Sequence, residues 1–374
     1  MNILTKTKMC LKNLLGCKTR RKIVVIHVDD YGSIRVKDIA SRERLNALGI
    51  PMESSRYFRW ETLCTTEDLQ KLFEVLTSVK DSHGHHACFT PFANIANPDF
   101  EKIRASGFEH YYREPFTETL KRYGKPYEGA YELWKQGISE GIFHPEYHGT
   151  EHICVRRFMR ALQAGVKSVR LAFDHECVSL PGLPGEAPVK YLSSVFNIEA
   201  PEDNELLDEA IRQGCRIFSE TLGYLPRQFT PGNGAHSMQL NPALYECGIR
   251  YVNSGRRWIN PLGNGQFEKH FYWTGRQDRY GMKYIVRNCV FEPFLNDCSL
   301  NANAAENCLA NVEAAFRMHM PAIISSHRVN FSGGIDTVHR DESLRQLKVL
   351  LQEIVHRWPE VEFMDSSKMA DEVL

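Results

Sequence analysis

Short apolar runs alternate along this chain with longer segments in which apolar residues recur at helical spacing. Ile23 to Val28 is a β-branched run of the kind that forms a buried strand. Thr66 to Val79 carries Leu69, Leu72 and Phe73 on one face, as an amphipathic helix does. Repeated from residue 23 to the C-terminus, this alternation predicts about seven or eight βα units around a parallel sheet, an α/β fold.

The same patterns give the expected elements one by one. The predicted strands are Ile23–Val28, Ala87–Phe92, Ile142–Tyr147, Ser168–Phe173, Arg227–Thr230, Tyr251–Asn253, Tyr284–Val290 and Ala322–Ser326. The predicted helices are Thr66–Val79, Pro98–Ser106, Pro115–Tyr123, Tyr127–Gly141, Ile153–Ala164, Asn204–Gly214 and Glu342–Arg357. Pro181–Pro188 is predicted to be an exposed loop, and no linker or internal repeat divides residues 23–374, so we expect one domain there.

Charge balance and cysteine content bear on whether the protein binds nucleic acid and on the compartment in which it works. The chain has 46 basic and 46 acidic residues, a balance that gives no reason to expect nucleic acid as a partner. No apolar run is long enough to span a bilayer. Eleven cysteines at irregular spacing, with no Cys-x-x-Cys pair, suggest reduced, mostly buried thiols and a cytoplasmic location.

Residues 1–22 contain no acid and form a basic segment before the first strand. Leu14-Leu15-Gly16-Cys17 is similar to the end of a lipoprotein signal, but lysines interrupt the apolar core that such a signal needs. We therefore expect a solvated basic tail. The alternative is a short amphipathic helix that makes weak contact with an anionic membrane surface.

Candidate chemistry begins with polar residues at strand ends, where α/β folds place their sites. Asp29 and Asp30 close the first strand. His148 and His152 follow the third, and if the chain is helical after Gly149 their imidazoles share one face. Two histidines with a distant carboxylate are a ligand set that zinc accepts while keeping one position open for water.

Two other histidine groups compete with this pair. His144 and His148 are also four residues apart, but Pro145 and the strand character around it keep them from sharing a helical face. The cluster His83-Gly84-His85-His86 could bind metal adventitiously, although a polar loop is the simpler interpretation.

Two later strand ends carry further polar residues. Phe229-Thr-Pro-Gly-Asn-Gly234 contains glycines that allow a close backbone approach, and an amide near Asn233 could face a developing oxyanion. His327 ends the strand that begins at Ala322, a position suited to a general acid.

Together these groups resemble the motifs of a known family. Asp29-Asp30, His148-x-x-x-His152, the Phe229–Gly234 segment and Ile324-Ser-Ser-His327, in this order, are similar to the motifs of the polysaccharide deacetylase superfamily, the NodB-homology fold that includes carbohydrate esterase family 4. The resemblance runs from about residue 23 to the end of the chain. It implies a distorted (β/α)7 barrel with one divalent metal ion, commonly Zn²⁺.

Carried over residue by residue, the resemblance implies that Asp29 is the catalytic base and His327 the general acid. It implies that Asp30, His148 and His152 hold the metal. One departure stands out: Thr230 occupies the place where many members have an arginine that orients the base. Arg170 is a candidate substitute.

The resemblance also implies the reaction class, removal of an acetyl group from an N-acetylated sugar or oligosaccharide. Two alternatives remain open. One is metal-dependent hydrolysis of a non-sugar carbon–nitrogen bond or of a glycosidic bond on the same barrel. The other is a carbohydrate-binding relative without catalysis.

Overall fold

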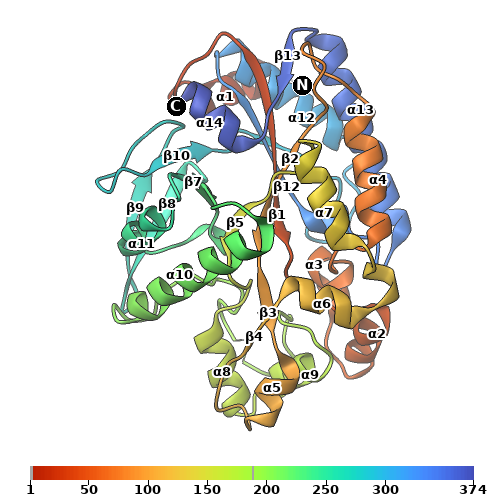
Figure 1. The fold of residues 1–374 in the computed structure, drawn as a ribbon, viewed down its shortest axis with the longest axis vertical. Coiled ribbons are helices and arrows are strands. Elements are labelled where there is room, and N and C mark those ends of the chain that lie inside the picture. The colour runs from red at the N-terminus through yellow and green to blue at the C-terminus, as the bar shows by residue number, and fades with distance from the viewer. Residues whose placement is uncertain (1–2, 188) are drawn as a thin grey trace.

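A curled sheet of parallel strands occupies the centre of the molecule, with helices around it (Figure 1). The computed structural model describes residues 3–187 and 189–374. Neighbouring strands follow the order β10-β7-β6-β5-β2-β1-β12-β11, and all of these pairs are parallel. Their bounds are β1 (Lys22–Tyr31), β2 (Phe89–Asn94), β5 (Glu146–Gly149), β6 (Gln228–Phe229), β7 (Tyr251–Ser254), β10 (Lys283–Val286), β11 (Cys289–Val290) and β12 (Ala322–His327), while β13 (Val361–Phe363) pairs with the start of β1.

The two edges of this sheet approach each other. Only Arg287 and Asn288 separate β10 from β11, although these strands lie at opposite ends of the strand order. Three Cα steps span at most about 11 Å, so the sheet curls until its edges are close. β10 and β11 thus form one bent strand, whose first half (β10) pairs with β7 and whose second half (β11) pairs with β12. The result is a distorted (β/α)7 barrel with seven strand positions, as predicted.

Alternation along β1 separates the inside of the barrel from the helical layer. Ile23 and Val25 pack inward against Ile285, Ile323 and Met369, which close the bottom of the barrel. The alternate residues Val24, Ile26 and Val28 point the other way and pack in the large core under the helices. His27 and Asp29 continue the inward row toward the carboxyl end of the strand.

Helices of the outer layer bury apolar residues in the core around the sheet. α4 (Thr66–Thr77) follows the prediction, with Leu69, Leu72, Phe73 and Leu76 buried and a capping box at Thr65. The other helices are α1 (Ile3–Lys12), α2 (Ile39–Ala47), α3 (Arg56–Arg59), α5 (Phe100–Ala105), α6 (Phe116–Tyr123), α7 (Ala130–Ser139), α8 (Val155–Gln163), α9 (Lys167–Asp174), α10 (Asp203–Leu222), α11 (Asn241–Glu246), α12 (Ala304–Arg317), α13 (Thr337–Arg357) and α14 (Ser366–Val373). Two antiparallel pairs lie outside the barrel, namely β3 (Ala96–Pro98) with β4 (Arg113–Pro115) and β8 (Arg257–Gly263) with β9 (Gln266–Phe271).

One predicted strand is wrong. Ser168–Phe173 lies within the helix α9, where Ser168, Val169, Ala172 and Phe173 are buried. Buried residues at positions i, i+1, i+4 and i+5 form one face of a helix. The prediction failed because a short apolar run does not distinguish a helix from a strand. The loop predicted at Pro181–Pro188 is part of a longer irregular segment, residues 175–202, in which Pro188 lies outside the described residues.

The N-terminal segment differs from a free tail. α1 lies beside α12, and the Asn13 side chain accepts a hydrogen bond from Asn288 (2.8 Å). The backbone N–H of Cys17 donates to the Thr274 carbonyl (2.9 Å). Leu11, Leu14 and Leu15 remain exposed, so the membrane contact considered from the sequence stays a prediction.

The structure bears on two expectations from the sequence, the absence of a membrane span and the reduced state of the cysteines. Among the described helices, none combines the length and apolar character required to cross a membrane. All eleven cysteines are free thiols, seven of them buried.

Candidate active site

A backbone distortion at the end of β1 turns two adjacent carboxylates toward the same cavity. In a regular strand Asp29 would point inward and Asp30 outward. Asp30 instead has φ of +76°, and the pairing of β1 with β2 shifts between Val28 and Tyr31. The Ser33 hydroxyl donates to the Asp30 carbonyl (2.9 Å) and holds this turn. Both carboxylates are buried and line one cavity.

Asp30 faces the predicted histidine pair. Its Oδ1 lies 3.0 Å from Nε2 of His152 and 3.3 Å from Nε2 of His148. His148 is on β5, but His152 lies in the turn before α8, so the helical arrangement expected for the pair is wrong. Gly149, with φ of +119°, reverses the chain between them and brings the two rings together. His144 lies apart and stacks on Tyr224.

The surroundings of these three residues suit a metal ion. Ligand atoms bonded to a tetrahedral zinc at about 2.0–2.1 Å lie roughly 3.3–3.4 Å apart, close to the two distances from Asp30. His148 donates its Nδ1–H to the Thr230 carbonyl (2.6 Å), so its Nε2 lone pair faces Asp30. Burial lowers the pKa of the His152 imidazole, which favours its neutral form. The donor set therefore fits the ion that the family resemblance implies.

Asp29 is held by an arginine that the sequence did not reveal. Nη1 and Nη2 of Arg287, at the bend between β10 and β11, donate to the two carboxylate oxygens at 2.6 Å each. Burial alone would raise the pKa of Asp29, but Arg287 lowers it to about 2. Arg170, the substitute considered from the sequence, instead donates to the Leu162 carbonyl and lies over the ring of Phe108.

His327 lies beside Asp29 on the neighbouring strand, in register with it. Its Nε2 is 3.9 Å from Asp29 Oδ2, and its Nδ1 is 2.6 Å from Glu292 Oε1. Glu292 also accepts from Arg56 (2.5 Å). Burial would lower the pKa of His327, but Glu292 raises it to about 9, so the imidazolium persists at neutral pH. Sequence reasoning did not find Glu292.

The loop after β6 forms another wall of the cavity. Asn233 has φ of +57°, and its amide donates to the hydroxyls of Ser193 (3.0 Å) and Ser194 (3.1 Å). A Cβ at Gly232 would come within 3.2 Å of the His152 ring, so a glycine lets the loop approach that ring. The loop is thereby fixed between His152 and the irregular segment 175–202.

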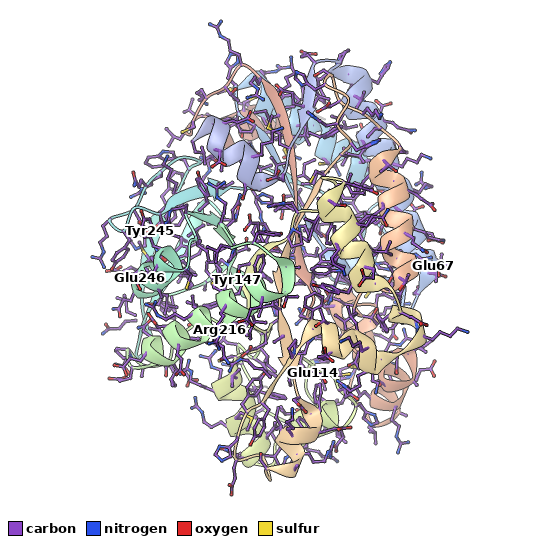
Figure 2. The ribbon with its side chains drawn as sticks, in the orientation of Figure 1. Glu67, Glu114, Tyr147, Arg216, Tyr245 and Glu246 are labelled. Atoms are coloured by element: carbon purple, nitrogen blue, oxygen red, sulfur yellow. The ribbon has the colours of Figure 1, made fainter. Side chains whose placement is uncertain are left out.

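The cavity has a volume of about 470 Å³, within the range of small-molecule sites. The neighbouring residue Tyr147 shows how β5 separates the cavity from the helices, since its side chain lies against α10 (Figure 2) while that of His148 points into the cavity. The lining comprises Asp29, Asp30, Arg35, Tyr57, Phe58, His148, His152, Ser179, Ser193, Thr230, Pro231, Asn233, Gly234, Asn253, Ser254, Gly255, Arg287, Val290, Ser325 and His327.

No protein-family model matches the sequence, and no curated protein matches it either. The chain is similar to solved structures of polysaccharide deacetylases and family 4 esterases. A family 4 acetyl xylan esterase from Clostridium thermocellum is 11% identical, with 94% of this chain and 91% of that chain covered at a TM-score of 0.36. A structure described as T48 deacetylase with substrate is 11% identical (95% and 93% covered, TM-score 0.38). The alpha-amylase AmyC from Thermotoga maritima is also 11% identical (95% and 75% covered, TM-score 0.47).

The pairing of His327 with Glu292 leads to a prediction about pH. If the imidazolium is the form that acts, activity should fall as the pH rises through the pKa of His327. Glu292→Gln removes the main cause that raises this pKa, so the basic limb of the rate profile should move to lower pH, by about 1–3 units. The same pair stabilises the fold below the ordinary pKa of 6.5, and that contribution is lost as the pH rises toward 9.

Rate profiles of wild type, Glu292→Gln and the exposed control Glu306→Gln test this. An unchanged basic limb in Glu292→Gln, in a variant that is folded by circular dichroism, would show that His327 does not set the limb.

Proposed function

We propose that this chain is a metal-dependent hydrolase that removes the acetyl group from an N-acetylated sugar or oligosaccharide. The observation that supports it is the arrangement of three groups in one cavity. Asp30, His148 and His152 form a compact ligand set, Asp29 lies beside them as a separate ionised carboxylate, and Nε2 of His327 lies 3.9 Å from Asp29. Amide hydrolysis needs these three functions.

Asp30, His148 and His152 would hold one divalent ion, for which two imidazoles and a carboxylate favour Zn²⁺. When bound, the ion lowers the pKa of water and polarises a carbonyl group. Asp29 then accepts the proton of the attacking water. Its bidentate pair with Arg287 keeps the carboxylate ionised and fixes its orientation, the part that an arginine at position 230 plays in many family members.

His327 completes the reaction by protonating the leaving nitrogen. The water oxygen bonds to the acetyl carbon, the carbon–nitrogen bond breaks, and acetate and a free amine are released. Glu292 holds the imidazole through Nδ1, so Nε2 is the atom that faces Asp29 and gives up the proton. A backbone N–H near Asn233 would donate to the developing oxyanion.

The lining supports a sugar as the substrate. Hydroxyls of Ser179, Ser193 and Ser254 can exchange hydrogen bonds with sugar hydroxyls, and Tyr57 and Phe58 add aromatic surface. The volume of about 470 Å³ suits one or two sugar rings, with the acetyl group at the carboxylates.

A direct test is to incubate the purified chain with a panel of N-acetylated and O-acetylated sugars and measure released acetate, with and without a chelator. We expect release from an N-acetylated sugar that stops with chelator and returns with Zn²⁺. Release of reducing ends without acetate would indicate glycosidic cleavage instead. Binding without any product, in metal-loaded protein, would indicate a carbohydrate-binding protein.

A further inference from the structure

Outside the cavity, a second group of metal-binding side chains gathers in the loop between α4 and β2. Asp81, His83 and His85 each place a ligand atom within 4.8 Å of the others. We propose that these three residues form a second metal site, with Zn²⁺ as its preferred ion. This inference is independent of the proposed enzymatic function.

The carboxylate of this group is fixed before any ion binds. The Asp81 side chain is fully buried, and its Oδ1 accepts the backbone N–H groups of His83 and His85 at 2.8 Å each. Its Oδ2 accepts the N–H of Phe363 on β13 (2.9 Å) and lies 3.5 Å from Nδ1 of His85. An oxygen with one donor keeps a lone pair for a metal ion.

The imidazoles are exposed, although Nδ1 of His83 also contacts the Ser82 hydroxyl at 3.4 Å. His83 and His85 have side chains 58% exposed, and their ring centroids are 6.1 Å apart. Ligands around a tetrahedral zinc lie about 3.3–3.4 Å apart, so a small rotation of the exposed rings brings all three atoms into range. His86 lies outside this group, since only Asp81, His83 and His85 place their ligand atoms within 4.8 Å of one another, and its Nδ1 engages the Val79 carbonyl (2.9 Å).

A further carboxylate lies beside the group. Glu362 on β13 places Oε2 3.7 Å from Nδ1 of His83, although Arg21 also pairs with this carboxylate. Two imidazoles with carboxylates suit Zn²⁺, whereas Mg²⁺ and Ca²⁺ prefer sets made of oxygens alone. An ion here would cross-link residues 81–85 of the loop before β2, and the Asp81 carboxylate also accepts the N–H of Phe363 on β13.

The site is separate from the catalytic cavity. Phe363 pairs with Val24 at the start of β1, six residues before Asp30, which is about 20 Å along an extended strand. The two groups can therefore bind ions without competing, and they are distinguishable by mutation.

The test is calorimetric titration of the metal-free full-length chain with Zn²⁺ at neutral pH. We expect two equivalents in wild type with at least micromolar affinity, one in His85→Ala and one in Asp30→Asn, while the control His86→Ala keeps two. Zn²⁺, but not Mg²⁺, should also raise the Tm of Asp30→Asn, and His85→Ala in that background should abolish the rise.

Equal stoichiometry in wild type and His85→Ala would overturn the proposal. So would a second equivalent that binds only at millimolar Zn²⁺, which would mean an adventitious ion only. If Asp30→Asn does not fold, the difference between wild type and His85→Ala still decides the matter, and neither result depends on enzymatic activity.

Discussion

Asp30→Asn should lose most of the ion held in the cavity, whereas Asp29→Asn should keep that ion and lose about 10²-fold to 10⁴-fold in turnover, the usual contribution of a general base. The two carboxylates are adjacent in sequence but have different partners. Asp30 faces the Nε2 atoms of His148 and His152, and Asp29 faces Arg287 and His327. Removing the charge of Asp30 weakens a ligand, while removing that of Asp29 leaves the ligand set intact.

Both variants are best made in the His85→Ala background, so that bound metal reports on the cavity alone. Metal content by elemental analysis and turnover on an N-acetylated sugar are then measured together. Asp174→Asn, which changes an exposed carboxylate paired with Arg104, is the matched control and should alter neither. Loss of the ion from Asp29→Asn with retention in Asp30→Asn would show that the two roles are exchanged.

The barrel itself was predictable because its strands are continuous apolar runs. A parallel strand buried on both faces is a near-continuous hydrophobic run, as are Ile23–Val28, interrupted only by His27, and Ala322–Ile324. The run Tyr284–Val290 was predicted as one strand, and in the structure it is one bent strand that joins both edges of the sheet. The short run at Ser168–Phe173 misled the prediction, since at that length helix and strand look alike.

The site residues that directly follow a strand could be predicted from the sequence. The residues whose side chains reach the cavity only through an unusual local backbone conformation were harder to place. Asp30 reaches the cavity through a positive φ, and His152 through the turn at Gly149, neither of which a periodicity reveals. The same strand-end argument could have found Arg287, the first polar residue to interrupt the run Tyr284–Val290, and Glu292, the first acid after that run. Which partner each of these two side chains meets depends on the curl of the sheet, which the sequence does not specify.

His327→Ala should lower kcat by about 10²-fold to 10⁴-fold while changing substrate affinity little, because a general acid acts when the leaving nitrogen takes its proton. Nε2 of His327 lies 3.9 Å from Oδ2 of Asp29 in the same cavity, and Glu292 keeps the ring charged. A substrate whose leaving group needs no proton should bypass the defect.

The decisive comparison is therefore between two substrates, an N-acetylated sugar and an activated acetate ester. In His327→Ala the rate on the amide should fall far more than the rate on the ester, and in wild type and the exposed control His110→Ala the ratio of the two rates should be the same. The ring also touches Tyr57 edge-on at 5.7 Å between centroids, so its removal opens space in the wall of the cavity. His327→Gln, which refills part of that space without supplying an imidazolium, separates the two effects: it should be as defective as His327→Ala on the amide. Equal losses on both substrates, or recovery of amide hydrolysis in His327→Gln, would mean that the histidine supports the shape of the cavity and gives no proton to the leaving group.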